Sequence, residues 1–343
     1  MTSINALRFD EKSGILVCDE QRTWNDEEMK IDSCDKIRPI VTSDVLAGSG
    51  IAVCYGNTGT STLGDEWTTN MTKRMSQRFA VWKDSRQPQH FMSVNDVAQL
   101  AYDEQTRLKH DHIDQQLKGK FGFTSSEFIA GSYERDGRRI EIKDKKIIDQ
   151  IPEYLTWSSR GGAVTGVFLN AGIIAGYSPA DGFRIYLLSL IDPTCEPVSE
   201  IYLAEGSGLD ICDHLYTDFA NARSIPERRG SIDRGIGTLK MIEGLNFAID
   251  LCAGVGGYIK VIYINGHETD PLKRIKEISD CRSKLASEIA IAYTRRFMDE
   301  ATAVRLIEDI LYRDRPFAEV NAELLKSVPD SRGFVRYLRG YTN

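Results

Sequence analysis

The order of strand-like and helix-like segments is the sequence feature that most constrains how this 343-residue chain can fold. Strand signals come first, followed by two helical segments, a second group of strands, two more helices and a last strand. A doubly wound sheet alternates single strands with single helices, whereas here the helices arrive in pairs between antiparallel strand groups. The sequence therefore predicts an α+β fold in which two sheets pack face to face with a helical layer outside each sheet.

Alternation, turn residues and capping signals predict the individual elements. The chain opens with a hairpin around the turn DEKSG, and the glycine-rich SDVLAGSG at 43–50 is predicted as a loop ahead of the strand at 51–55. Ser93 and Asp96 have capping-box spacing and mark a helix start. The predicted strands are 2–9, 15–18, 36–41, 51–55, segments within 161–178, 183–192 and 199–208, and a last strand that ends near 266. The predicted helices are 60–83, 93–116, 209–222 and 234–252.

Two regions fall outside this order of strands and helices. Residues 118–160 are highly charged and have little apolar periodicity, and we interpret them as an insertion with an exposed hairpin and a short helix. Asp270 and Pro271 supply the start signals of a long helix, so residues 267–343 are predicted to form a helical C-terminal extension. The sandwich domain is accordingly predicted over residues 1–266.

Composition and charge exclude several classes of function. The formal net charge is −7 and the pI is about 5.4, which gives no electrostatic reason to bind nucleic acid or a membrane surface. No apolar run has the length of a transmembrane helix, and the start lacks the regions of a signal peptide, so a cytoplasmic protein is expected. The seven cysteines form no C-x-x-C pair, and His110 and His112 point to different faces of a helix. The sequence therefore predicts neither a metal site nor a cofactor.

The amino terminus carries the residue on which the functional prediction depends. An initiator methionine is normally removed before a small residue, which would leave a hydroxyl and a free amine together on Thr2. Combined with the order of strands and helices, this opening resembles the N-terminal nucleophile hydrolases, and within them the proteasome β-subunit type. The resemblance implies a four-layer αββα sandwich with a catalytic threonine at the processed amino terminus.

Three residues match the catalytic residues of that family in order and spacing. Thr2 falls at the nucleophile, and Asp19, at the end of the second strand, matches the family's acidic residue. Lys36 in DKIRPI matches the lysine beside the nucleophile. Thr23 matches a hydroxyl residue of the substrate-binding edge. The resemblance covers residues 2–266 apart from the insertion.

The remaining matches concern the oxyanion hole and the terminal amine. Gly56 in GNTGT matches the backbone donor at the start of the first helix, with Gly50 as the competing choice because the preceding loop is longer. Ser207, within Gly-Ser-Gly, matches the residue near the amine, and Asp250 matches the family's second aspartate. Ala253 is a departure, since the family usually has a serine at that position.

The resemblance implies an N-terminal-threonine amidohydrolase or peptidase that acts on a peptide or protein through an acyl-enzyme ester at Thr2. The α-amine would act as the base, Lys36 would stabilise the developing alkoxide, and Asp19 would keep that lysine charged and oriented. Assembly into a homo-oligomer is also implied. Two alternatives stay open. A transpeptidase would use the same acyl intermediate to ligate peptides, and a non-catalytic, proteasome-like structural subunit is favoured by Ala253.

Overall fold

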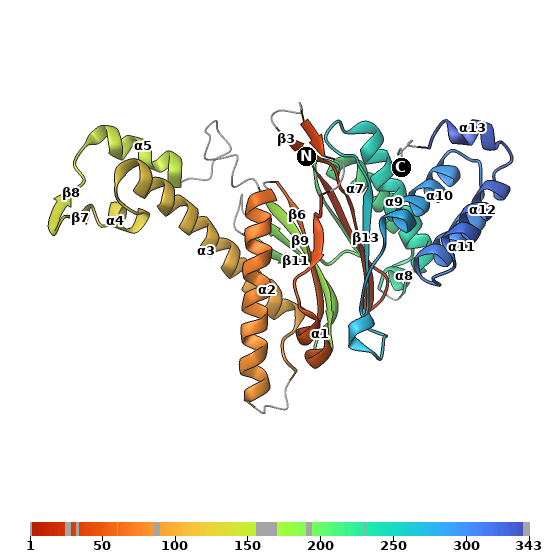
Figure 1. The fold of residues 1–343 in the computed structure, drawn as a ribbon, viewed down its shortest axis with the longest axis horizontal. Helices are drawn as coiled ribbons and strands as arrows, with labels where there is room; N and C mark the ends of the chain where they lie inside the picture. Colours follow the sequence, from red (N-terminus) through yellow and green to blue (C-terminus); the bar gives the residue numbers. More distant parts are fainter. Residues whose placement is uncertain are drawn as a thin grey trace.

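Two five-stranded antiparallel sheets form the centre of the protein, shown as a computed structural model in Figure 1. The structure describes residues 2–24, 29–31, 34–59, 61–85, 90–155, 170–189, 194–229 and 231–338. The first sheet has the strand order β12 (Tyr202–Gly206), β1 (Ser3–Arg8), β2 (Ser13–Asp19), β13 (Ile259–Asn265) and β14 (Ile275–Glu277). The second has the order β11 (Thr194–Pro197), β10 (Gly182–Ser189), β9 (Ala171–Ser178), β6 (Ala52–Thr58) and β5 (Ile37–Pro39). A short hairpin of β3 (Arg22–Trp24) and β4 (Met29–Ile31) follows β2.

Strand β2 shows why the first sheet lies between two apolar layers. Its residues 15–18 are apolar at every position, and successive side chains of a strand point to opposite faces. Leu16 and Cys18 belong to the apolar cluster shared with the second sheet, whereas Ile15 and Val17 belong to the cluster between the first sheet and the helices that cover its outer face. Burying a Val, Leu or Ile side chain contributes roughly 1.5–3 kcal/mol to stability. An uninterrupted apolar run therefore fits a strand with both faces covered.

Helices cover the outer face of each sheet. Helices α2 (Ser61–Asp84) and α3 (Val94–Phe121) contact strands of the second sheet (Figure 1). Helices α7 (Leu209–Asn221) and α9 (Arg234–Leu251) contact strands of the first sheet. The layers thus follow one another as helix, sheet, sheet and helix, and the α+β class predicted from the sequence is confirmed.

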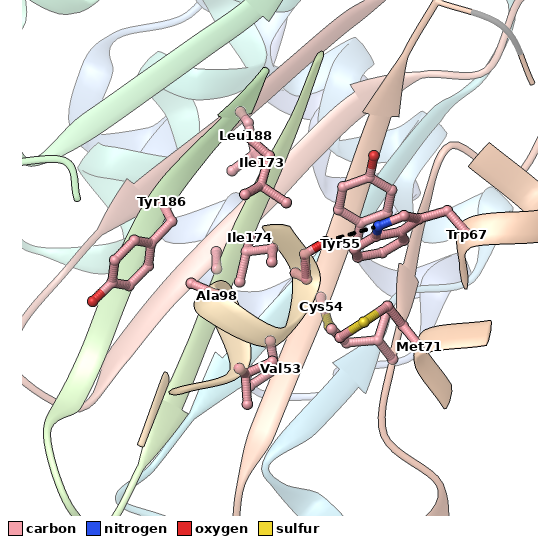
Figure 2. Packing of buried hydrophobic residues seen from close by; sticks show 14 of the residues in the cluster. Val53, Cys54, Tyr55, Trp67, Met71, Ala98, Ile173, Ile174, Tyr186 and Leu188 are labelled. Carbon is pink, nitrogen blue, oxygen red and sulfur yellow. Dashed lines mark hydrogen bonds between the residues drawn. The ribbon is translucent and has the colours of Figure 1, made fainter. Parts of the chain in front are cut away.

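Trp67 of α2 joins two helices to the second sheet. Its ring lies against Tyr55 of β6, with the ring centroids 3.9 Å apart, and Met71 lies beside them (Figure 2). The Trp67 Nε1–H group donates a hydrogen bond to the carbonyl oxygen of Ala101 in α3 at 3.2 Å. Because the indole is buried and its N–H group is paired, the packing gains apolar burial without leaving a donor unsatisfied.

The segment SDVLAGSG, predicted as a loop, is instead helix α1 (Ser43–Ser49). The Thr42 side chain accepts a hydrogen bond from the Val45 N–H group at 3.4 Å and so caps the first turn. Gly50 ends the helix in the left-handed conformation, with φ of 73°. Glycine directly after a helix is a common stop signal, so the glycines that favoured a loop mark a helix end instead. One helix therefore precedes β6, contrary to the prediction.

Asp270 begins a single turn of 3₁₀ helix, η1 (Pro271–Lys273), and the predicted long helix does not start there. The chain continues as β14, in which Ile275 pairs with Ile264 of β13. The long helix α10 (Asp280–Thr294) comes only after that strand. The prediction was wrong because Ile275 belongs to a strand at the edge of the sheet. An apolar residue at helical spacing can belong to a helix or to a short strand, and the spacing alone does not distinguish them.

The helices after β14 pack against the first sheet's helical layer. Helices α10 and α11 (Glu300–Leu311) contact α9, and α12 (Phe317–Ser327) and α13 (Ser331–Val335) follow them (Figure 1). Their buried apolar side chains belong to the same cluster as those of β2 and α9. The short helix α8 (Ile225–Arg229) precedes α9. Residues after 266 thus add a strand and a helical layer to the sandwich, and the domain boundary at 266 stays a prediction.

Helix α3, whose Ser93–Asp96 capping box is confirmed, continues beyond the second sheet and carries an arm at its far end (Figure 1). The arm consists of α4 (Ser125–Ile129), the hairpin β7 (Ser132–Arg135) and β8 (Arg138–Glu141), and α5 (Lys145–Leu155). A hairpin and a short helix were predicted within 118–160. The end of that region and the predicted strand residues 161–169 lie outside the described residues.

Candidate functional site

Thr2 is buried directly ahead of β1, with 6% of its surface exposed. Its carbonyl oxygen accepts a hydrogen bond from the Ser207 N–H group at 2.6 Å. Gly206 makes this approach possible, because a Cβ atom there would lie 2.2 Å from the Thr2 carbonyl oxygen. Gly206 also has φ of 97°, a conformation that favours glycine. The turn after β12 therefore holds the backbone of Thr2 in place.

Asp19, at the end of β2, is fully buried and accepts hydrogen bonds on both carboxylate oxygens. Its Oδ1 atom accepts from the Ser3 N–H group at 2.8 Å and from the Lys36 ammonium at 2.9 Å. Its Oδ2 atom accepts from the Gly256 N–H group at 3.0 Å. Burial raises the pKa of the Asp19 carboxyl, and the Lys36 charge and the backbone donors oppose that rise.

Lys36 reaches the same carboxylate from the other sheet, since it stands directly before β5. Its side chain is 7% exposed. Its carbonyl oxygen accepts a hydrogen bond from the Asn57 N–H group of β6 at 3.0 Å, which fixes the backbone from which the side chain extends. The structure thus brings together Lys36, Asp19 and the amide group that follows Thr2. Lys36 and Asp19 are two of the three residues that the sequence matched in order and spacing, and the third, Thr2, directly precedes the Ser3 amide.

Gly56 does not lie in a turn at the start of a helix, as was predicted, but within strand β6. It pairs with Ile37 on one side and with Ile173 on the other. A Cβ atom at Gly56 would lie 2.7 Å from Cγ2 of Ile4 and 3.1 Å from Cγ2 of Ile37. Because Gly56 has no side chain, the first and second sheets can approach each other closely at this position. The competing choice, Gly50, lies at the end of α1, where the Arg274 guanidinium donates to its carbonyl oxygen at 2.5 Å.

Gly59 is the glycine that stands between β6 and α2. Its φ of 96° is left-handed. The residue before it, Thr58, is placed close to Thr2, because a Cβ atom at Gly206 would lie 3.2 Å from Cγ2 of Thr58 as well as near the Thr2 carbonyl. The end of β6, at Thr58, therefore lies in the neighbourhood of Thr2.

Ser207 and Asp250 have different surroundings. Ser207 contacts Thr2 through its backbone, as described above, and its side chain is exposed. Asp250, at the end of α9, has a side chain that is 45% exposed and lies 3.5 Å from the guanidinium of Arg295, which directly follows α10. Cys252 connects the two regions, since its thiol donates to the Ser207 carbonyl oxygen at 3.5 Å. The contact of Asp250 with Arg295 gives no support to a role for its carboxylate at the Thr2 amine.

Glu20, the first residue after β2, is a titratable group that sequence reasoning missed. Only 6% of its surface is exposed. Burial raises the pKa of its carboxyl to about 7, Asp280 and Asp35 add to the rise, and Lys260 and Lys36 oppose it. A second carboxyl beside the buried pair therefore changes its charge near neutral pH.

Sequence reasoning also missed the backbone donors of the site. Ser3 and Gly256 supply N–H groups to Asp19, and no side-chain pattern marks such a role. The glycine pair at 256–257 after α9 was a signal that the sequence offered for one of them. Gly256 is a position that favours glycine, because a Cβ atom there would lie 2.3 Å from Oε1 of Gln21. Thr23 lies in β3, but its side chain is outside the described part of the chain. No group of three His, Cys, Asp or Glu side chains that could hold a metal occurs among the described residues.

Comparisons with known proteins bear on the fold. No protein-family model matches the sequence, and no similar sequence is found among curated proteins. A solved structure of an Anbu (Gly-1) mutant from Hyphomicrobium sp. strain MC1 is similar, with a TM-score of 0.53 and 11% sequence identity. The likeness is one of fold. It covers 86% of this chain and 96% of the Anbu chain. In the part of the chain that the structure describes, no helix is long and apolar enough to span a membrane.

Proposed function

We propose that the protein is an N-terminal-threonine amidohydrolase of the proteasome-like class, acting on peptide bonds through an acyl-enzyme ester at Thr2 after removal of Met1. The observation that carries the proposal is the Oδ1 atom of Asp19. It accepts from the Lys36 ammonium at 2.9 Å and from the Ser3 N–H group, next to Thr2, at 2.8 Å. A buried charge pair beside a candidate nucleophile is costly to maintain and is typical of a functional site.

The chemistry follows from these groups. A threonine hydroxyl is a weak nucleophile at neutral pH, and the free α-amine, with a reference pKa of about 8, is near enough to take its proton directly or through a water. The Lys36 charge favours the neutral form of that amine and stabilises negative charge developing on the Thr2 oxygen. Asp19 keeps the ammonium of Lys36 in position. The products are an ester at Thr2 and a released amine, and water then hydrolyses the ester.

For the oxyanion we propose the backbone N–H group of Gly59 in place of Gly56. Gly59 follows the strand residue that lies near Thr2 and leads into α2, whose N-terminal N–H groups favour negative charge. One oxyanion donor contributes roughly 3–4 kcal/mol to lowering the barrier of acyl transfer. Ser207 supports the site through its hydrogen bond to the Thr2 carbonyl oxygen. Asp250 is left out of this mechanism because of its contact with Arg295.

The fold supports the same class of protein. Anbu is a proteasome-like protein, and its fold covers most of this chain. Two alternatives have support of their own. A transpeptidase would pass the Thr2 ester to a second peptide, and the helices after β14 give this chain an added layer that could shield such an ester. A non-catalytic subunit is favoured by Asp250, whose carboxylate contacts Arg295, and by the alanine at position 253.

The test is acylation of Thr2. The purified protein is measured by intact mass spectrometry before and after treatment with a β-lactone, and the labelled residue is found by peptide mapping. We expect a chain that begins at Thr2 and one adduct on that residue. Thr2→Ser should keep the adduct, whereas Thr2→Ala should lose both the adduct and the turnover of a fluorogenic peptide library.

Thr69→Ala is the matched control, because Thr69 is a threonine on the exposed face of α2 whose hydroxyl donates to the Asp65 carbonyl oxygen at 2.9 Å. It should be labelled as the wild type is. A retained Met1, or an adduct that persists in Thr2→Ala, would overturn the proposal. Adding a nucleophilic peptide separates the alternatives, since a transpeptidase yields a ligated product and a hydrolase yields the free acid.

A further inference from the structure

A cavity of about 340 Å³ lies between α9, α10 and the end of α13, outside the Thr2 site. Its walls combine charged and apolar side chains. The charged ones that matter for its chemistry are Glu243 and Asp250 of α9, Arg295 after α10, and Arg336 after α13. The volume is of the size that holds a small molecule or the end of a peptide. The helices after β14 thus create a pocket that the sandwich would not have on its own.

Arg295 is positioned by two contacts and keeps hydrogen-bonding capacity. Its guanidinium carbon lies 5.0 Å from the centre of the Tyr337 ring, and one of its nitrogens lies 3.5 Å from the Asp250 carboxylate. That separation is at the outer limit of a hydrogen bond, so Asp250 holds the group loosely. Arg336 forms no ion pair within the residues that the structure describes. A guanidinium presents five N–H donors, and both arginines can therefore bind a planar anion.

The carboxylate of Glu243 is already satisfied. Its Oε2 atom accepts from the Lys240 ammonium at 2.8 Å, and its Oε1 atom accepts from the Thr294 hydroxyl at 3.3 Å. With Glu243 neutralised by Lys240, the cavity has two arginine charges against one carboxylate, that of Asp250. The balance favours one negative charge on a ligand, and the nearby carboxylates disfavour a dianion such as phosphate.

One part of the remaining wall is apolar and is anchored in the core. Phe247, Ile291 and Tyr337 supply it, and Asn246 and Thr294 add polar groups to the rest of the wall. Phe334 of α13 is fully buried, with its ring centroid 5.7 Å from that of Phe297, so the chain that carries Tyr337 is fixed to the body of the protein. An apolar wall beside a cationic end requires a ligand with the same two parts.

We propose that this cavity binds a monoanionic carboxylate attached to an apolar or aromatic body, with the carboxylate between Arg295 and Arg336. A peptide C-terminus and a free aromatic acid share this chemistry. The proposal does not depend on the function proposed for Thr2, because it concerns binding and not turnover.

Isothermal titration calorimetry on the full chain tests it with four probes: N-acetyl-Ala-Phe, the C-terminal amide of the same dipeptide, 3-phenylpropanoate and inorganic phosphate. The free acids should bind, and the amide should bind at least about tenfold more weakly because it lacks the charge. Phosphate should not bind. Tighter binding of the dipeptide acid than of 3-phenylpropanoate identifies a peptide C-terminus as the ligand, and equal binding identifies a free acid.

Arg336→Gln should weaken binding of the acids at least about tenfold, since it removes one charge-assisted contact at an exposed position. Arg332→Gln is the matched control, because Arg332 lies on α13, the short helix that Arg336 directly follows, and it is exposed and does not line the cavity. It should bind the acids as the wild type does, and the contrast between the two variants locates the site at the cavity. Equal affinity for acid and amide, or unchanged binding in Arg336→Gln, would overturn the proposal.

Discussion

The ammonium nitrogen of Lys36 lies 2.9 Å from Oδ1 of Asp19, and the two side chains are 7% and 0% exposed. Taking both charges out of water is expensive, and the pair is tolerable only because further hydrogen bonds satisfy the carboxylate. The N–H groups of Ser3 and Gly256 supply them. The pair therefore depends on the backbone at two separate places, at the residue after Thr2 and at the glycine pair that follows α9.

Replacing Lys36 by methionine should destabilise the protein by about 3–5 kcal/mol near pH 8, because Asp19 would be left as an unpaired buried charge. Burial already raises the pKa of Asp19, and loss of the ammonium raises it further. A carboxyl whose pKa is raised in the folded state destabilises the protein as pH rises through that pKa. The loss of stability caused by Lys36→Met should therefore be smaller at pH 5 than at pH 8. Urea unfolding at the two pH values measures it. Lys273→Met, which removes an exposed pair 3.9 Å from Asp270, should change stability by less than about 1 kcal/mol.

Gly206→Ala should disturb Thr2 directly. The left-handed φ of 97° alone costs alanine about 1–2 kcal/mol, and the added Cβ atom would also lie 2.2 Å from the Thr2 carbonyl oxygen. Gly131→Ala is the control, because Gly131 has φ of 72° but has nothing within 4 Å of the added atom. We expect thermal unfolding to show the larger loss for Gly206→Ala, together with slower lactone labelling of Thr2. Equal losses in the two variants would mean that the contact with Thr2 carries no strain.

Glu20 should make stability depend on pH around neutrality. The pKa of the Glu20 carboxyl in the folded protein is about 7, above the ordinary value of 4.5. Its contribution to stability is therefore fully present below pH 4.5 and is lost as pH rises through 7. Glu20→Gln, which stays neutral, should be more stable than the wild type at pH 8 by roughly 1–3 kcal/mol and should differ little at pH 5. Glu196→Gln, at an exposed position of β11, should leave the pH profile of unfolding unchanged. Parallel wild-type and Glu20→Gln profiles would contradict the prediction.

Order and spacing predicted where some of the candidate site residues lie in the fold. The hairpin of β1 and β2 and the position of Asp19 at a strand end could be read from the sequence, because short apolar runs on either side of a turn are local signals. Lys36 was identified by its distance along the chain. Its contact with Asp19 joins two sheets, and only the similarity to a known order of residues brought the two together.

Three glycines show what could not be predicted from the sequence. Gly50, Gly56 and Gly59 lie within ten residues of one another, and residue type alone does not distinguish their roles. One ends a helix, one lies between the sheets, and one forms the turn before α2. The end of β6 decides among these uses. The sequence predicts that the strand ends before Gly56, whereas β6 continues to Thr58, so the turn and the proposed donor are at Gly59, three residues later. The surroundings of Asp250 were also not predictable, because Arg295 lies at the end of α10, in the part of the chain that the resemblance does not cover.

The two glycines can be separated by experiment. Gly56→Ala should lower the midpoint of thermal unfolding strongly, because its Cβ atom would lie 2.7 Å from Ile4 in the space between the sheets. Gly59→Ala should be milder, since Gly59 is exposed and the main cost is its left-handed φ of 96°, about 1–2 kcal/mol.

If the Gly59 N–H group binds the oxyanion, a distorted turn should slow acylation of Thr2 more than it weakens substrate binding, so kcat should fall by about tenfold or more with little change in KM. Lactone labelling rates and peptide turnover, both normalised to the folded fraction from circular dichroism, measure this. The informative comparison is with Gly137→Ala in the arm, which has φ of 70° and open space around it. That variant has the same backbone strain far from Thr2, and a loss of turnover equal to that of Gly59→Ala would show that strain alone, without an oxyanion contact, accounts for the effect.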